Sequence, residues 1–431
     1  MIVCSHPKHF SKSLRPHSRT TSIKPPSFPN RCTPQSRRCR VLLMIASMDG
    51  GGSERQTLLL LRHLSRATFS PELLVLRRGG SLYDQIPADV PVHCLEESLP
   101  PRRFAWPGRI HAAQVDALKR LLIDRETDLI YDRTFHMTLI AGPAAAAVAL
   151  PRVSTIVSPP SHAVPLNAGR FLALKKKKLE QAYAQAARVI AVSGPTANDA
   201  RRYYRLPARQ VRVVPNPVDT AGLLAQVAAA PVPPRDSRYT IACVGRMTAE
   251  KGHLCLIQAL DCLRQTHPTF PLPRLWLVGD GALRGPLEAL THRLNLRDCV
   301  EFLGHVADPS PWIAAADALC LPSLFEGFPN VMLEAMALGT PVIASDMEVV
   351  RSLGRVAQNW EDRGRDYVAT FSGQDPAALA RKIVRLRTNP TATYSRITSA
   401  RNLARRAHAI EAIVPRIEMI MLEASQARTA P

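Results

Sequence analysis

Two glutamates stand eight positions apart in the segment 322–339, and they are the residues most able to do chemistry. An apolar run ends at Pro322, and the glycine after Glu326 predicts a turn just beyond the edge of a sheet. Asn330 is a good helix N-cap, so we expect Glu334 one turn into the following helix. Because a helix N-terminus offers free N–H donors and partial positive charge, the segment suits an anionic ligand. Taken singly, Glu326 would be a loop residue and Glu334 a favourable acid of a first helical turn.

Two series of alternating strands and helices must position these side chains. The first opens with a strand over 40–46, a glycine turn at 50–52 and a helix over 56–64, and its further strands are predicted at 72–76, 128–131, 153–157, 189–192 and 211–215. The second has strands predicted at 239–244, 275–278, 300–302, 318–321 and 342–344, with helices over 253–265, 283–294 and 330–338. Both series are typical of parallel α/β sheets.

A Pro- and Ala-rich stretch, 226–238, separates the two series and is the predicted linker. The predicted fold class is therefore α/β, with two doubly wound, Rossmann-like domains that face a cleft. The domains are predicted at 40–225 and 239–395, followed by a helical segment at 396–431, and residues 1–39 are predicted to be a disordered basic extension. Since ligands of such sheets bind at the carboxyl ends of the strands, the interdomain cleft is the expected active site.

The segment around the two glutamates resembles the Glu-x7-Glu motif of glycosyltransferase family 4, whose members have the two-domain GT-B fold. Two further motifs fall in the family's order. The stretch Gly50–Arg55 is similar to the Gly-Gly-x-Glu-Arg signature, and Gly245–Gly252 resembles the Gly-Arg…Lys-Gly loop. The resemblance covers roughly residues 40–390. It implies that 40–225 is the acceptor-side domain and that 239–395 binds the donor, a nucleoside-diphosphate sugar.

The resemblance also implies roles for residues at the donor site. Arg246 and Lys251 would bind the diphosphate, while Glu326 would contact the sugar hydroxyls and Glu334 the ribose. Negative charge develops on the leaving diphosphate, so fixed cations beside it stabilise the transition state. An arginine supplies a planar fork that suits phosphate oxygens, and a lysine supplies a compact point charge. The predicted donor-binding set is Gly51, Gly52, Arg246, Lys251, Gly327, Phe328, Asn330 and Glu334.

The catalytic step implied by the resemblance is retaining and uses no protein nucleophile behind the sugar. The acceptor attacks the face that the diphosphate leaves, and a phosphate oxygen accepts the proton. Many members place a histidine beyond the fourth strand of the first domain, and His136 lies a few residues after the commonest position. We predict His136 and Glu326 as the catalytic residues; the alternatives are His162, or a loop or capping role for His136. Neither a metal nor a cofactor is expected beside the sugar nucleotide, because no metal-ligand spacing is present.

The formal net charge of +21 is concentrated in the N-terminal half, where residues 1–40 carry nine lysines and arginines and no acidic residue. Lys175–Lys178 is a dense basic run. It predicts either a solvated helix face or a contact with an anionic membrane that carries a lipid-linked acceptor. Aromatic residues make up only 5% of the chain and do not interleave with the basic clusters, which argues against nucleic acid as a partner.

Cysteine usage and hydropathy bear on the compartment. Nine cysteines are scattered without a Cys-x-x-Cys pair, as in a reducing compartment. No run reaches the roughly 18 apolar residues of a membrane span. The expected location is therefore cytoplasmic, with peripheral association at the cytoplasmic face of the membrane. For residues 1–39, the alternatives to disorder are a targeting segment and a start codon that has been assigned too far upstream.

These features together predict a retaining glycosyltransferase that passes a hexose-type sugar to a saccharide or lipid-linked acceptor, in cell-envelope polysaccharide or glycolipid synthesis. Two alternatives remain: a GT-B-fold sugar-nucleotide epimerase, and a non-catalytic scaffold that binds saccharide or membrane. One departure concerns the donor sugar. The glycine-rich continuation expected after Val350 is replaced by Arg351-Ser-Leu-Gly-Arg-Val-Ala-Gln-Asn, so sugar specificity is expected to differ here.

Overall fold

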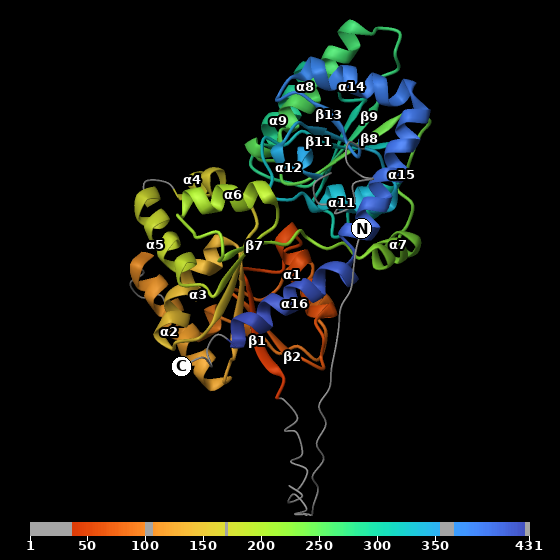
Figure 1. Ribbon diagram of the computed structural model, residues 1–431. Coiled ribbons are helices and arrows are strands. Elements are labelled where there is room, and N and C mark those ends of the chain that lie inside the picture. The colour runs from red at the N-terminus through yellow and green to blue at the C-terminus, as the bar shows by residue number, and fades with distance from the viewer. Residues whose placement is uncertain (1–36, 100–106, 169–170, 354–365, 427–431) are drawn as a thin grey trace, which may run out of the picture. The chain divides into compact units, whose positions relative to one another are not determined.

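The computed structural model describes residues 37–99, 107–168, 171–353 and 366–426 (Figure 1). Both sheets belong to one compact unit, residues 38–431. The predicted basic extension therefore lies almost wholly outside the described residues.

The first sheet has seven parallel strands in the order β3-β2-β1-β4-β5-β6-β7. Its strands are β1 (Cys39–Ile45), β2 (Phe69–Val75), β3 (Val92–Cys94), β4 (Leu129–Arg133), β5 (Arg152–Ile156), β6 (Arg188–Ala191) and β7 (Val211–Val213). The strand order reverses between β1 and β4, so the loops that follow these two strands diverge and leave a crevice. The sequence did not predict β3, because this edge strand has only three residues and two of them are partly exposed.

The second sheet has six parallel strands in the order β10-β9-β8-β11-β12-β13. Its strands are β8 (Thr240–Val244), β9 (Arg274–Val278), β10 (Val300–Gly304), β11 (Ala318–Leu321), β12 (Val342–Ser345) and β13 (Ala369–Phe371). Here the order reverses between β8 and β11. The predicted fold class, two Rossmann-like parallel-sheet domains, is confirmed.

Helices cover both faces of each sheet, because alternate residues of a strand point to opposite sides. In β1, Val41 and Leu43 pack in the core beside α1 (Gly52–His63) and α16 (Ile410–Gln426). Leu42 and Met44 pack on the other side, beside α2 (Pro107–Asp124) and α3 (Phe135–Ala147). The remaining helices of the first half are α4 (Pro160–Ala168), α5 (Leu172–Ala184) and α6 (Gly194–Tyr203).

The second sheet is layered in the same way. One face packs against α8 (His253–Thr266), α9 (Arg284–Arg293) and α14 (Pro376–Thr388). The other face packs against α11 (Asn330–Leu338) and α15 (Pro390–Ala407). The shorter helices are α7 (Thr220–Ala229), α10 (Ser310–Ala315) and α12 (Glu348–Arg351).

The chain crosses between the sheets twice. Helix α7 contacts α10 and α11, so the predicted linker 226–238 begins inside a helix that packs with the second sheet. Helix α16 returns to the first sheet, where Ile413 and Ile417 enter the core beside β1, as the α16 and β1 labels of Figure 1 indicate. The two crossing segments touch at a parallel bridge between Val218 and Ala409. We call the first sheet with its helices, including α16, the first lobe, and the second sheet with its helices the second lobe.

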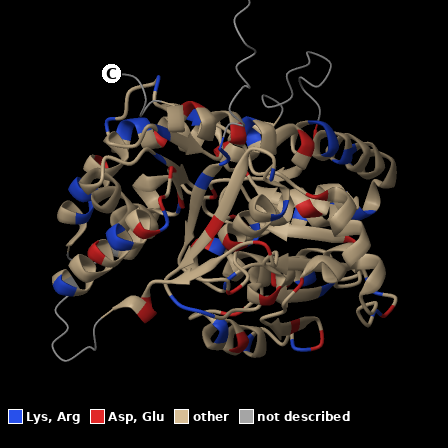
Figure 2. Ribbon diagram, turned by 90° about the horizontal axis from the view of Figure 1, so that it is seen from below, with Lys and Arg blue, Asp and Glu red and all other residues tan. Residues whose placement is uncertain are grey.

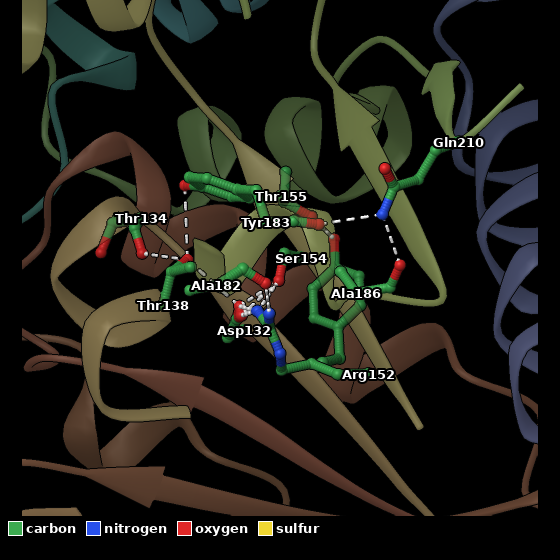
Figure 3. A network of polar contacts seen from close by, with 11 residues as sticks. Asp132, Thr134, Thr138, Arg152, Ser154, Thr155, Ala182, Tyr183, Ala186 and Gln210 are labelled. Atoms are coloured by element: carbon green, nitrogen blue, oxygen red, sulfur yellow. Dashed lines mark hydrogen bonds and ion pairs between the residues drawn. The ribbon is translucent and has the colours of Figure 1, made fainter. Parts of the chain in front are cut away.

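A fully buried ion pair lies inside the first lobe (Figure 3). Nη1 of Arg152 lies 2.9 Å from Oδ1 of Asp132, and these side chains are 2% and 0% exposed. Ser154 and Thr138 donate hydrogen bonds to the same carboxylate, and Arg152 donates to the carbonyl of Ala182. The pair therefore joins β4, β5, α3 and α5.

Candidate active site

A cavity of about 820 Å³ lies where the carboxyl ends of the central strands of both lobes converge. These are the strands on either side of each reversal in strand order, where ligands of doubly wound sheets bind. The first lobe contributes Gly51, Gly52, Glu54, Arg133 and His136. The second lobe contributes Arg246, Lys251, Glu326, Phe328, Asn330 and Glu334. Nine of the ten residues of the predicted site therefore line one cavity, and Gly327 is the exception.

The loop after β8 carries the two predicted phosphate-binding cations. Arg246 is exposed in the cavity wall, and Lys251 ends a short 3-10 turn, Ala249–Lys251. Gly252 follows with φ +70, and a Cβ at this position would lie 1.9 Å from the carbonyl oxygen of Pro322. Only glycine fits this approach. The loop after β8 is thereby fixed against the loop that follows β11, which bears Glu326.

Lys251 and Glu326 form an ion pair across these two loops. Nζ of Lys251 lies 2.6 Å from Oε1 of Glu326, and the side chains are 25% and 14% exposed. Ser323 donates a second hydrogen bond to the same oxygen at 3.0 Å. Such a partly buried, hydrogen-bonded pair holds both side chains in fixed positions at the cavity wall.

Asn330 does not cap its helix as predicted. Pro329 occupies the N-cap position of α11, and Asn330 is the first helical residue. Its amide nitrogen donates instead to the carbonyl oxygen of Gly52 at 2.9 Å, and its amide oxygen accepts from Asn216 at 2.7 Å. A side chain engaged with the first lobe in this way cannot fold back onto its own helix. Asn330 therefore ties the start of α11 to the glycine turn.

Gly327 lies beside the cavity, where the second lobe contacts the first. A Cβ at Gly327 would lie 1.9 Å from the carbonyl oxygen of Val157, and the Gly327 carbonyl accepts a hydrogen bond from Thr196 at 3.4 Å. The donor contact predicted for Gly327 has no counterpart among the cavity-lining residues. Its neighbour Phe328 does line the cavity, with its ring 5.0 Å from that of buried His408.

Glu334 lies on α11 at the cavity wall and is partly exposed. Desolvation raises the pKa of its carboxyl above the ordinary value of 4.5, and the nearby Arg55 opposes the increase. Arg55 itself donates to the carbonyl oxygens of Gly50 and Ala307, which joins the glycine turn to the second lobe. A carboxylate in such a poorly solvated position is suited to accept hydrogen bonds from two neighbouring hydroxyl groups, such as those of a ribose.

We expect Glu334→Ala to weaken nucleoside diphosphate binding about 10- to 100-fold, because a hydrogen bond to a charged acceptor contributes about 1.5–3 kcal/mol. Isothermal titration calorimetry would measure the Kd. Because the pKa of Glu334 is raised, its carboxylate is lost at a higher pH than usual as the pH falls. Wild-type affinity should therefore decline in mildly acidic buffer, whereas Glu334→Gln should show no such decline. A flat wild-type profile, or normal affinity in Glu334→Ala, would contradict the assignment.

His136 lines the cavity, as does His305 from the second lobe. His136 stands in the first turn of α3, two residues after Thr134, whose φ of +75 is rare for a residue with a Cβ. Desolvation and the neighbouring Lys175 ammonium both lower the pKa of the His136 imidazole. His162, the alternative, stacks on Phe325 with ring centroids 4.9 Å apart and is not among the cavity-lining residues.

The cavity wall also includes polar residues outside the predicted set, among them Glu54, Arg133 and Asn216. Glu54 lines the cavity, and its pKa is raised by desolvation and by Asp49, against the attraction of Arg246 and Arg133. Arg133 and Asn216 also line it, and the guanidinium of Arg133 donates to Asn216 at 2.8 Å. The Gly-Gly-x-Glu-Arg signature contained the signal for Glu54. Arg133 was signalled by its place three residues before His136, and Asn216 by its place directly after the strand predicted at 211–215.

Comparison with known families accounts for both lobes. The family described as "Glycosyltransferase Family 4" matches residues 50–221, and the one described as "Glycosyl transferases group 1" matches residues 238–389. These ranges fall on the first and the second sheet. The chain belongs to glycosyltransferase family 4, and its two sheets are those of the GT-B fold.

Curated relatives match over parts of their length. The lipopolysaccharide core biosynthesis glycosyltransferase LpsD of Rhizobium meliloti is 33% identical over 35% of this chain and 40% of its own length. The D-inositol 3-phosphate glycosyltransferase of Salinispora tropica is 34% identical over 48% of this chain and 45% of its own. The aligned segments therefore span less than half of each of these relatives.

Among solved structures, HepE of Anabaena, in complex with UDP and glucose, superposes with a TM-score of 0.70 at 21% identity. The superposition covers 89% of this chain and 99% of HepE. At this identity the likeness concerns the fold.

Proposed function

We propose that this protein is a retaining glycosyltransferase that moves a hexose-type sugar from a nucleoside-diphosphate sugar to a saccharide or lipid-linked acceptor. The observation that carries the proposal is one cavity that brings together Arg246, Lys251, Glu326 and Glu334. Two cations suit a diphosphate, and two carboxylates suit the hydroxyls of a sugar and a ribose. HepE, which shares the fold, is solved with UDP-glucose, and LpsD is named for lipopolysaccharide core synthesis. These names support a cell-envelope saccharide as the acceptor.

In the proposed reaction the bond between the anomeric carbon and the diphosphate oxygen breaks as the acceptor oxygen bonds to the same face of that carbon. The acceptor proton passes to the departing phosphate oxygen. Arg246 and Lys251 stabilise the negative charge that develops there, so the proposal needs no metal. Glu326 orients the sugar, and the neutral imidazole of His136 stands on the acceptor side of the cavity.

The function is tested by incubating the protein with a panel of radiolabelled UDP-, GDP-, ADP- and CDP-sugars, with and without EDTA. Slow release of the nucleoside diphosphate from one donor, unaffected by EDTA, is the expected result. An epimerised donor would indicate the epimerase instead. No binding of any member of the panel would favour a non-catalytic scaffold.

We further propose that α5 meets the anionic membrane surface that carries the acceptor, with the protein peripheral on the cytoplasmic face. Lys175 and Lys176 lie over aromatic rings, 4.9 Å from the centroid of Phe135 and 4.4 Å from that of Tyr203. Lys177 and Lys178 are left exposed. Three large apolar side chains near them are also exposed: Leu166 by 63%, Phe171 by 62% and Leu174 by 55%.

Basic and acidic residues are interspersed along most of the described ribbon (Figure 2). Within the described ranges no helix is both long and apolar enough to cross a bilayer. A peripheral contact would therefore depend on exposed side chains such as those of α5, where lysines can meet lipid phosphates while leucine and phenylalanine enter the interface.

Replacing Lys177 and Lys178 by glutamine should lower partitioning onto phosphatidylcholine vesicles that contain phosphatidylglycerol by about 30-fold. Each lysine near an anionic surface contributes about 1 kcal/mol. Sedimentation with vesicles measures the effect, and Arg405→Gln with Arg406→Gln, two exposed positions on α15, removes the same charge as a control. Equal loss in the control, or unchanged sedimentation in the lysine variant, would argue against a contact through α5.

A further inference from the structure

Arg133 is a buried cation in the cavity wall without a carboxylate partner. It ends β4, is 4% exposed, and lines the cavity. Its Nη2 donates to Asn216 at 2.8 Å and the hydroxyl of Tyr131 lies close by, whereas Nε has no hydrogen-bond partner. Among the residues that the structure describes, no carboxylate lies within ion-pair distance of this guanidinium.

A charge in this position is costly unless an anion meets it. Removing a guanidinium from water without a counterion carries a penalty of several kcal/mol, and an arginine does not escape it by losing its proton. Glu54 lines the same cavity and attracts Arg133, but it forms no ion pair with it. Desolvation also raises the pKa of Glu54. The protein itself therefore leaves the charge of Arg133 largely uncompensated.

A relay of side-chain amides holds the guanidinium in place. Asn216 accepts from Arg133 and donates to Asn330, and Asn330 donates to the Gly52 carbonyl. Because arginine is only a donor, the direction of all three hydrogen bonds is fixed from one end. Since Asn330 belongs to the second lobe, the orientation of Arg133 depends on the contact between the lobes. A charge held this firmly at a cavity wall is suited to bind a ligand.

We propose that Arg133 binds an anionic group of the acceptor, a phosphate or a carboxylate, beside the reacting sugar. This inference rests on the proposed function. The position favours the acceptor over the donor: Arg133 stands on the first lobe, three residues before His136, whereas the donor cations Arg246 and Lys251 lie on the loop after β8. Lys175, close enough to lower the pKa of His136, adds positive charge on the same side. The acceptor is thus an anionic saccharide or a phosphate-linked carrier.

The test uses the full-length protein saturated with whichever nucleoside diphosphate it binds, so that the donor cations are occupied. Inorganic phosphate is then titrated by calorimetry. Wild type should bind one further equivalent, Arg133→Gln should lose at least tenfold in phosphate affinity, and Arg133→Lys should lose less. Arg120→Gln, an exposed arginine on α2, is the matched control and should bind as wild type does. Circular dichroism checks that each variant is folded.

Three outcomes would overturn the inference. In the first, the wild-type complex with nucleoside diphosphate binds no inorganic phosphate; in the second, Arg133→Gln binds inorganic phosphate as tightly as wild type does. In the third outcome Arg133→Gln binds the nucleoside diphosphate itself more weakly, which would place Arg133 at the donor. If no nucleoside diphosphate binds at all, the proposed function fails, and phosphate is then titrated into the ligand-free protein with the same comparison of variants. Asn216→Ala checks the relay. If Asn216 positions Arg133, its removal should weaken phosphate binding in the wild-type background and have no further effect in Arg133→Gln. An equal loss in both backgrounds would assign Asn216 a merely structural role.

Discussion

We expect Glu326→Gln to lower kcat for sugar transfer about 100-fold while the Kd of the nucleoside diphosphate changes little. The substitution keeps the shape of the side chain and removes its charge. Glu326 forms an ion pair with Lys251 at 2.6 Å. The amide oxygen of a glutamine can still accept a hydrogen bond from Lys251, so the lysine stays in place while the carboxylate proposed to orient the sugar hydroxyls is lost. A reacting group misplaced by about 1 Å can cost roughly 100-fold in rate, which sets the expected magnitude.

The kcat for transfer and the Kd of the nucleoside diphosphate together separate the role of Glu326 from that of Glu334. Stopped assays with labelled donor give kcat, and calorimetry with the nucleoside diphosphate alone gives Kd. Glu288→Gln is the matched control, since Glu288 also forms an ion pair, with Arg284 at 2.8 Å, but lies on the exposed face of α9. If Glu326→Gln weakened nucleoside diphosphate binding as much as it slowed transfer, Glu326 would belong to the nucleotide site and not to the sugar site.

The sequence was sufficient to predict the strands and loops that carry the donor-site residues. The apolar runs before Arg246 and before Glu326 are buried strands, and the glycines that follow permit the close approach of their loops. The cavity was predictable because parallel strands expose their carboxyl ends at one edge and the order of each sheet reverses beside its first strand. These features are local, or follow from chain order, so periodicity and turn residues reveal them.

Contacts between distant segments could not be predicted in the same way. Asn330 has the residue type of an N-cap, but its amide serves the first lobe, because Gly52 and Asn216 stand opposite it. Gly327 belongs to the motif that carries the resemblance, but the sequence did not show that the backbone carbonyl of Val157 lies against its Cα. A helical segment was predicted at 396–431, but the sequence did not show that the buried face of α16 covers the first sheet.

The ion pair between Asp132 and Arg152 leads to the largest expected effect on stability (Figure 3). We expect Asp132→Ala to lower the free energy of unfolding by about 3–5 kcal/mol, because it leaves the guanidinium of Arg152 buried without a counterion. For a lobe of this size, such a loss corresponds to a fall of roughly 10 °C in the apparent Tm. Differential scanning fluorimetry measures the shift. Asp89→Ala is the matched control, because Asp89 pairs with Arg66 at 2.6 Å but is 56% exposed, and its loss should shift Tm little.

Removing both charges separates the cost of an orphaned arginine from the contribution of the pair. In Asp132→Leu/Arg152→Met no buried charge remains, and apolar side chains of similar length fill the space, so the double variant should be more stable than Asp132→Ala. The same carboxylate accepts a hydrogen bond from Thr138 on α3, the helix whose first turn carries His136. Transfer activity should therefore stay low in the double variant even where Tm recovers, because charge balance restores stability but not the anchor of α3. Recovery of both stability and activity would show that the pair serves the fold alone and that packing is enough to hold His136 at the cavity.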